Sequence, residues 1–241
     1  MSNSEMEQGL ESIATDAQAT DALADGSPSA TGDDTVAPAS RGRRYGGVGQ
    51  AQREAARRTA LIDAGTEVFG TVGFRRATVR SVCRLAKLND RYFYAAFDTM
   101  EHLLRATYAH HAQTLLGQLQ AAVATAEPTL DARLDAGLHA FFTFLRHPHA
   151  ARVLLLEVMG VSPETDSTYQ RYIFEFARLI VGMADAPPPT TEDAAADARI
   201  VGLALVGAMT NAGTAWVLTG YQDTEARMVA CCRRVLRGAL A

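Results

Sequence analysis

The chain has 241 residues, of which 48% are hydrophobic and 21% are charged, and its formal net charge is −4. A chain of this length forms one large or two small domains and can bury a sizeable core. The charge is segregated, because residues 1–40 carry −8, residues 41–97 carry +8 and the remainder carries −4. This segregation predicts a local polyanion-binding segment that the overall acidity conceals.

The first 45 residues are predicted to be a disordered acidic tail that ends in a basic arm. Residues 1–40 are poor in large apolar side chains, so burial cannot offset the entropy lost on ordering them. The arm contains Arg41, Arg43 and Arg44, and such arms follow phosphates or enter a minor groove, although a solvated linker explains the same residues. The sequence shows no signal peptide and no long apolar membrane segment, which predicts a soluble, cytoplasmic protein.

A first amphipathic helix is predicted from about residue 50 to residue 70. Leu61, Gly65, Val68 and Phe69 recur at the spacing of one buried helix face, and the glycine favours a close helix crossing. The other side of this helix carries three arginines that are expected to face phosphate or solvent: Arg53, Arg57 and Arg58.

Residues 77–97, ATVRSVCRLAKLNDRYFYAAF, predict two short helices joined by a tight turn. The first helix has Thr78 as its N-cap and runs over 79–86, with apolar residues at i, i+3, i+4 and i+7 on one face. The second follows Asn89, a further N-cap candidate, and places two phenylalanine rings, four residues apart, on its inner face. The segment is therefore predicted to be a helix-turn-helix.

The outer face of the second short helix is predicted to carry Asp90, Arg91, Tyr92, Tyr94 and Ala95. Two tyrosines beside an arginine are poorly explained by solubility, but they suit a helix that enters a major groove about 12 Å wide. DNA binding is therefore the leading hypothesis. The expected DNA contacts are Arg44, Thr78, Val79, Arg80, Asn89, Asp90, Arg91, Tyr92 and Tyr94.

Four short motifs occur in order between residues 53 and 104: Val68-Phe69, Gly73-Phe74, Thr78-Val79 and Phe93-Tyr94-x-x-Phe97. Several single residues accompany them, namely Arg57, Leu61, Ile62, Ala64, Val82, Ala86, Asn89, Glu101, Leu103 and Leu104. Together they make the segment resemble the TetR family of transcriptional repressors. The resemblance implies an all-α fold, in which an N-terminal three-helix helix-turn-helix domain precedes a C-terminal helical ligand-binding and dimerisation domain. Two positions depart from the family pattern. Lys87 replaces a turn glycine, and Met100 replaces a lysine that contacts phosphate.

After residue 98 the chain is predicted to be a succession of helices without strand alternation. The expected segments are 99–125, 129–146, 148–158, 166–184, 191–218 and 222–239, with prolines between several of them. The predicted organisation is a DNA-binding domain at 46–98 and an effector-binding and dimerisation domain at 99–241. The helix that begins at Thr99 follows the helix-turn-helix directly, so a movement of the second domain is expected to be transmitted to the first.

The middle of the second domain is rich in large apolar residues, and in TetR-like proteins the corresponding region encloses an effector pocket. A hydrophobic or amphipathic small molecule is therefore expected to bind there, although each residue taken singly is equally explained as core or surface. The predicted ligand-binding residues are His139, Phe142, Arg152, Leu156, Met159, Tyr172 and Phe176.

The last two helices are predicted to form a homodimer interface. Small and apolar residues recur at spacings of three and four, which lets helices approach closely, although core packing within one subunit gives a similar pattern. A two-fold dimer would place two reading helices on a palindromic operator. The predicted interface residues are Leu203, Gly207, Asn211, Ala215, Cys232 and Val235.

An enzyme is the competing class, and the sequence offers it little support. The adjacent His110-His111 and the His147-Pro-His149 motif lack the i, i+4 spacing of a helical metal site. No glycine-rich phosphate loop, Gly-x-Ser-x-Gly elbow or Cys-x-x-Cys motif is present in the sequence. We therefore expect no catalytic residues, no metal ligands and no cofactor. The cysteines are expected to be free thiols in a reducing cytoplasm, with a redox pair at 231–232 as the alternative.

The sequence thus predicts a ligand-responsive transcriptional regulator, in the first place a repressor. It is expected to bind a palindromic operator in double-stranded DNA as a homodimer and to be released by a hydrophobic effector. The alternatives are a ligand-independent DNA-binding or packaging protein and a helical enzyme.

Overall fold

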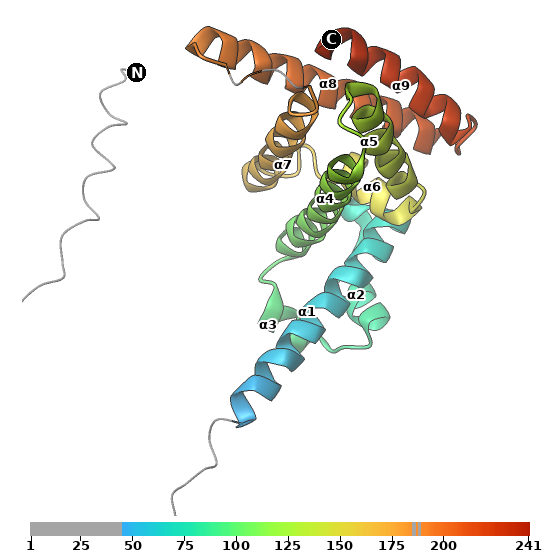
Figure 1. Ribbon diagram of the computed structural model, residues 1–241. Coiled ribbons are helices and arrows are strands. Elements are labelled where there is room, and N and C mark those ends of the chain that lie inside the picture. Colours follow the sequence, from blue (N-terminus) through green and yellow to red (C-terminus); the bar gives the residue numbers. More distant parts are fainter. Residues whose placement is uncertain (1–44, 185–186, 188) are drawn as a thin grey trace, which may run out of the picture. The chain divides into compact units, whose positions relative to one another are not determined.

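The computed structural model describes residues 45–184, 187 and 189–241, and these residues form helices and turns without β-strands (Figure 1). The predicted all-α fold is confirmed. The helices of this part of the chain are α1 (Tyr45–Val72), a short 3-10 turn (Phe74–Arg76), α2 (Val79–Ala86), α3 (Asp90–Ala96), α4 (Met100–Thr125), α5 (Leu130–Leu145), α6 (Pro148–Leu156), α7 (Pro163–Val181), α8 (Glu192–Leu218) and α9 (Glu225–Leu240).

The two short helices of the helix-turn-helix begin at the predicted caps. The Thr78 side chain accepts a hydrogen bond from the backbone N–H of Ser81, and the Asn89 side chain accepts one from that of Tyr92. Caps of this kind stabilise a helix by about 0.5–2 kcal/mol relative to alanine. Local capping therefore fixes where α2 and α3 start.

Two prolines open helices of the second domain. Pro148 is the first residue of α6 and Pro163 is the first residue of α7. The fixed φ of proline suits this position, and the N–H that it lacks would have no intrahelical partner there. Because Pro163 initiates α7, this helix starts three residues earlier than the predicted residue 166.

Helix α1 is longer than predicted. It begins at Tyr45 and ends at Val72, whereas the sequence indicated residues 50 to 70. Tyr45 is thus helical and is not part of the predicted arm. The predicted acidic tail and the arginines of the arm, including Arg44, lie outside the described residues.

The helix-turn-helix has a small aromatic core under α1. Phe93 and Phe97 of the α3 segment are buried, with ring centroids 6.0 Å apart, as the spacing predicted. Leu61 and Phe69 of α1 are fully buried against this core, and Val82 fills it from α2. The core holds the outer face of α3 in a fixed orientation.

The turn between α2 and α3 places Lys87 in the left-handed conformation, with φ 55° and ψ 37°. The backbone N–H of Lys87 donates a hydrogen bond to the carbonyl oxygen of Arg84. The N–H of Leu88 donates one to the carbonyl oxygen of Cys83 at 3.0 Å. The turn therefore keeps the geometry that glycine adopts freely, with a side chain that carries a steric cost there.

Replacement of Lys87 by glycine is expected to raise the free energy of unfolding by about 0.5–1 kcal/mol. The left-handed conformation costs a residue with a Cβ roughly 1–2 kcal/mol, and the greater freedom of glycine in the unfolded chain offsets part of the gain. Lys87→Val is the opposing control and should be destabilising, because a β-branched side chain fits this conformation worst. Urea denaturation measures both variants, and a less stable glycine variant would contradict the assignment.

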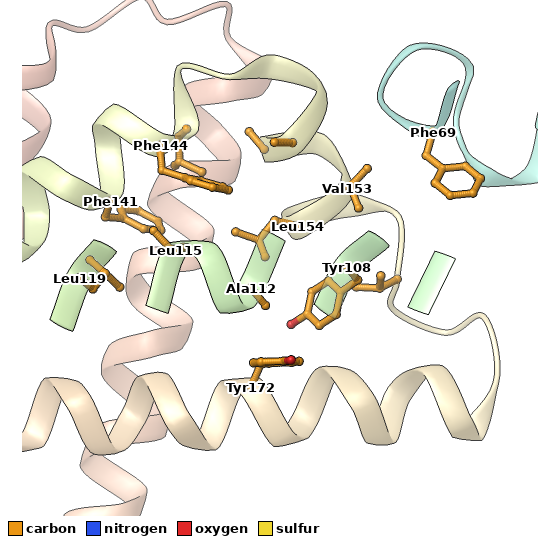
Figure 2. Close-up of a cluster of buried hydrophobic side chains, with 14 of the residues drawn as sticks. Phe69, Tyr108, Ala112, Leu115, Leu119, Phe141, Phe144, Val153, Leu154 and Tyr172 are labelled. Atoms are coloured by element: carbon orange, nitrogen blue, oxygen red, sulfur yellow. The ribbon is translucent and has the colours of Figure 1, made fainter. Parts of the chain in front are cut away.

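The second domain surrounds one apolar cluster. Figure 2 shows Tyr108, Leu115 and Leu119 along α4, with Phe141 of α5 on one side and Tyr172 of α7 on the other. The most extensive helix contacts are those of α7 with α8 and of α5 with α4 and α9 (Figure 1). The cluster is continuous with the core under α1.

Helix α1 crosses two helices of the second domain at glycines. A Cβ at Gly65 would lie 3.0 Å from Thr107 Oγ1 of α4, so the predicted close crossing at Gly65 is confirmed. A Cβ at Gly70 would lie only 2.4 Å from the Cα of His149 at the start of α6. The helix-turn-helix domain is thus attached to the second domain through both α4 and α6.

Candidate DNA-binding surface and effector cavity

The first turns of α3 form an exposed surface. Asp90, Arg91 and Ala95 are exposed, and Tyr94 exposes 60% of its surface. The Tyr94 ring packs edge-on against buried Phe93, with ring centroids 5.3 Å apart, so the base of this side chain is fixed while its hydroxyl projects outward. An arginine and a tyrosine on the outer face of a short helix match the chemistry that contacts base edges and phosphates in a major groove.

Tyr92 faces inward more than predicted. It is half-buried, because the guanidinium of Arg57 lies over its ring, 4.1 Å from the ring centroid. The Nη1 of Arg58 donates to the carbonyl oxygen of Ala96 at 2.8 Å, and its guanidinium lies over the ring of Phe97 at 4.3 Å. Both arginines therefore hold α3 against α1, where the sequence had indicated phosphate or solvent.

The remaining predicted DNA contacts among the described residues lie at the starts of α2 and α3. Thr78 and Asn89 are exposed and use their side-chain oxygens as helix caps, while Val79 is half-buried and Arg80 is exposed. The exposed basic residues between 75 and 91 outnumber the single acid, Asp90, and they are Arg75, Arg76, Arg80, Arg84, Lys87 and Arg91. This excess of exposed basic side chains over acidic ones is suited to the phosphates of a duplex.

A cavity of about 320 Å³ lies within the second domain. This volume is at the lower end of the range for small-molecule pockets, and apolar walls are typical of them. Of the predicted ligand-binding residues, Met159 and Phe176 line the cavity. The other lining residues are Tyr108, Leu115, Leu119, Leu134, Gly137, Leu138, Phe141, Leu154, Leu155, Tyr169, Ile173, Leu179, Ile180, Met183, Val206, Met209, Thr210, Asn211, Thr214 and Leu236.

The other five predicted ligand-binding residues lie away from the cavity wall. Phe142 is fully buried edge-on against Trp216, and Tyr172 packs against Tyr108 from α7. The imidazole of His139 is exposed beside the carboxylate of Glu225. Leu156 is exposed at the end of α6, and Arg152 pairs there with Glu157. Apolar periodicity identified buried faces without identifying their neighbours.

Arg152 and Glu157 form a contact between the two domains. The Oε1 of Glu157 accepts from Arg152 Nε at 2.8 Å, and its Oε2 accepts from the backbone N–H of Phe74 at 2.7 Å. The Glu157 side chain is only 12% exposed. Gly73, which has φ 82°, approaches the same carboxylate closely. We call this set of contacts the Glu157 latch, because it ties the end of α6 to the turn that leads from α1 to α2.

Two histidines link α1 to the second domain. The Nδ1 of His149 lies 2.7 Å from Glu67 Oε2, beside the Gly70 crossing. The Nε2 of His111 lies 2.8 Å from the Thr66 hydroxyl, and burial lowers the pKa of His111 to about 4. His111 is therefore neutral at physiological pH, and both residues serve as contacts between helices.

The exposed side of α8 is largely apolar from Ile200 onward, whereas the exposed side of α9 also carries Arg227, Arg234 and Arg237. Of the predicted interface residues on α8, Gly207, Asn211 and Ala215 are exposed and Leu203 is half-buried. Ile200, Ala204, Ala208 and Leu218 are exposed on the same helix. Val235 of α9 is 53% exposed. Among the described residues, α8 is the single helix that is long and apolar enough to cross a membrane by length and composition, but it packs along α7. A stripe of this kind is typical of a protein interface.

The cysteines are free thiols with different surroundings. Cys232 is buried on the inner face of α9, which corrects its prediction as an interface residue, whereas its neighbour Cys231 is exposed. Burial raises the pKa of Cys232, and burial together with the nearby Asp90 carboxylate raises the pKa of Cys83 to about 11. The two buried thiols are therefore protonated and serve as small apolar core residues.

Part of the described chain matches a known protein family in sequence. Residues 61–107 match the model of a family described as bacterial regulatory proteins, tetR family. The match extends from the second half of α1 through α2 and α3 into α4. It therefore includes the whole exposed surface of α3. No curated protein matches the chain in sequence.

Solved structures extend the similarity over both domains. The fatty acid degradation regulator FadR from Bacillus halodurans has a TM-score of 0.64 at 16% identity, covering 76% of this chain and 99% of that chain. FadR from Bacillus subtilis in complex with stearoyl-CoA has 0.63 at 17% identity, covering 76% and 97%. A tetR-family transcriptional regulator from Streptomyces coelicolor has 0.62 at 16% identity, covering 76% and 79%. At these identities the similarity shows a common fold.

Proposed function

Since the chain belongs to the TetR family of bacterial regulatory proteins, we propose that it is a transcriptional repressor that a small hydrophobic or amphipathic effector releases from a palindromic operator. The observation that carries the proposal is the outer face of α3, where exposed Arg91 and Tyr94 stand on a buried aromatic base among basic residues. Such a repressor acts in the cytoplasm on double-stranded DNA. It needs no catalytic residue, metal or cofactor.

Selection of bound duplexes from a random pool tests the proposal. A two-fold symmetric repressor should select a palindrome whose half-sites lie about 34–36 Å apart, one helical turn. Its preference for the selected site over arbitrary DNA should reach about 10³-fold or more at physiological salt. A ratio near one would favour the alternative, a ligand-independent packaging protein.

Replacement of Arg91 by alanine is expected to weaken binding to the selected operator by about 1–3 kcal/mol and to relax the preference at one base position. This magnitude is that of a bidentate arginine contact to guanine. Tyr94→Phe is the companion variant and should weaken all sequences alike, because its hydroxyl is expected to meet a phosphate. If Arg91→Ala lowered the affinity for every DNA sequence equally, the proposed contact of Arg91 with a base would be contradicted.

The proposed homodimer uses the apolar stripe of α8 and the exposed side of α9. Ala208→Glu is expected to shift the protein to monomers, because it places a charge at the centre of a closely packed interface. Ala121→Glu introduces the same change at an exposed alanine of α4 and should leave the oligomeric state unchanged. Sedimentation velocity compares the two, and an Ala208→Glu protein that remains dimeric would place the interface elsewhere.

The cavity and the Glu157 latch support effector control. Leu154 and Leu155 of α6 line the cavity, and Glu157 follows them directly at the latch on Phe74. A ligand that favours a displaced α6 would therefore shift the orientation of the DNA-binding domain. Coupling of this kind is typically about 1–3 kcal/mol, or roughly 5- to 150-fold in operator affinity.

A further inference from the structure

The cavity wall offers a ligand very little charge. No residue that lines it, among the part of the chain that the structure describes, has a charged side chain. The polar lining residues are Tyr108, Tyr169, Thr210, Asn211 and Thr214. Of these, the Thr210 hydroxyl already donates to the carbonyl oxygen of Val206 at 2.9 Å, and Asn211 is exposed on α8.

Tyr108 is the polar residue that lies deepest. It is only 1% exposed, it lines the cavity, and its hydroxyl has no hydrogen-bond partner among the described residues. Its ring lies against the rings of Tyr172 and Tyr169 of α7, with ring centroids 5.8 Å and 6.0 Å away. Figure 2 shows Tyr108 on α4 opposite Tyr172 on α7. The hydroxyl oxygen is not fully enclosed, since Asp131 Oδ1 is the one described side-chain atom that is both fully buried and without a partner, so a ligand in the cavity can reach this hydroxyl and accept its hydrogen bond.

The hydroxyl of Tyr108 is a donor at any physiological pH. Burial raises its pKa above the usual range, and the neighbouring Tyr169 and Tyr172 add to the shift. A protonated phenol can donate one hydrogen bond to a carbonyl or ether oxygen. A bound anion, in contrast, would lose its hydration without meeting a cationic side chain, which is strongly unfavourable in an apolar cavity.

We infer that the cavity takes an uncharged, largely apolar ligand whose carbonyl or ether oxygen accepts a hydrogen bond from the Tyr108 hydroxyl. The cavity of about 320 Å³ is roughly twice the size of one that holds benzene, so the buried part of the ligand has about twelve non-hydrogen atoms. The inference rests on the proposed function for its biological meaning. It assigns a ligand class distinct from the anionic stearoyl-CoA of the Bacillus subtilis structure.

Calorimetry on the full chain without DNA tests the ligand class with four probes: methyl octanoate, octanoate at pH 8, octyltrimethylammonium and decane. These probes bury similar apolar surface and differ in charge and in their acceptor oxygen. Methyl octanoate is expected to bind at least about tenfold more tightly than either charged probe. Failure of the ester to bind, or binding of octanoate as tight as that of the ester, would overturn the inference.

Two phenylalanine variants test the role of the hydroxyl. Tyr108→Phe is expected to weaken methyl octanoate roughly 2- to 12-fold, the range for one hydrogen bond, and to leave decane unchanged. Tyr172→Phe makes the same change in the same aromatic cluster, at a residue outside the cavity wall, and should leave both probes unchanged. Equal weakening of the ester and the alkane by Tyr108→Phe would show that the ring matters and the hydroxyl does not.

Operator release, measured separately by fluorescence anisotropy, distinguishes this inference from the proposed function. If the ester binds in a Tyr108-dependent way but leaves operator affinity unchanged, the ligand class stands and effector control fails. If a charged molecule releases the operator while the ester does not bind, effector control stands and the ligand class is wrong.

Discussion

Replacement of Gly70 by alanine is expected to lower the free energy of unfolding by roughly 3 kcal/mol, at the upper end of the range for overpacking. The new Cβ would lie 2.4 Å from both the Cα and the Cβ of His149. Because the contact is with the backbone, rotation of a side chain cannot relieve it. Helices α1 and α6 must move apart, which also strains the pair between His149 and Glu67.

Gly117→Ala is the matched control for this prediction. Gly117 lies within α4, is exposed, and an added Cβ would have no neighbour within 4 Å. The same substitution should therefore stabilise the protein by about 0.5–1 kcal/mol through helix propensity. Thermal denaturation of both variants measures the difference, and an unchanged melting temperature for Gly70→Ala would show that α1 and α6 are not in close contact in solution.

The helix-turn-helix could be predicted closely because its signals are local. Thr78 and Asn89 cap helices by bonding to N–H groups three residues away, and Phe93 and Phe97 share a face because they are four residues apart. The left-handed turn at Lys87 was harder to predict, since the residue type gives no sign of the conformation that its neighbours impose. Local spacing thus determines elements, caps and buried faces.

The site contacts between helices could not be predicted in the same way. The hydrogen bond between Arg58 and Ala96 joins residues 38 positions apart in the sequence, and the one between Glu157 and Phe74 joins residues 83 positions apart. No periodic pattern in the sequence connects the two members of either pair. The cavity illustrates the same limit. Phe142 and Phe176 are both apolar positions on helices, yet Phe142 packs against Trp216 while Phe176 lines the cavity. Which buried residues face empty space depends on how all the helices pack together.

Replacement of Glu157 by alanine is expected to break the latch between the domains and to lower the free energy of unfolding by about 2–4 kcal/mol. The variant leaves the N–H of Phe74 and the guanidinium of Arg152 without the carboxylate that both now contact. Hydrogen bonds to charged groups contribute about 1.5–3 kcal/mol, and a buried donor left unpaired adds its desolvation cost. Glu175→Ala removes an exposed carboxylate paired with Arg178 on α7 and should cost less than about 1 kcal/mol.

The same variant separates ligand binding from DNA release. The Glu157 side chain is not among the residues that line the cavity, so a ligand found by its melting shift should still bind and stabilise the Glu157→Ala protein. Its effect on operator affinity should fall from roughly 5- to 150-fold toward one, because α6 no longer holds the turn before α2. Titration of operator with and without the ligand measures this ratio. A ratio equal to that of the unmodified protein would mean that the coupling passes through α4 and the Gly65 crossing, without a contribution from the latch.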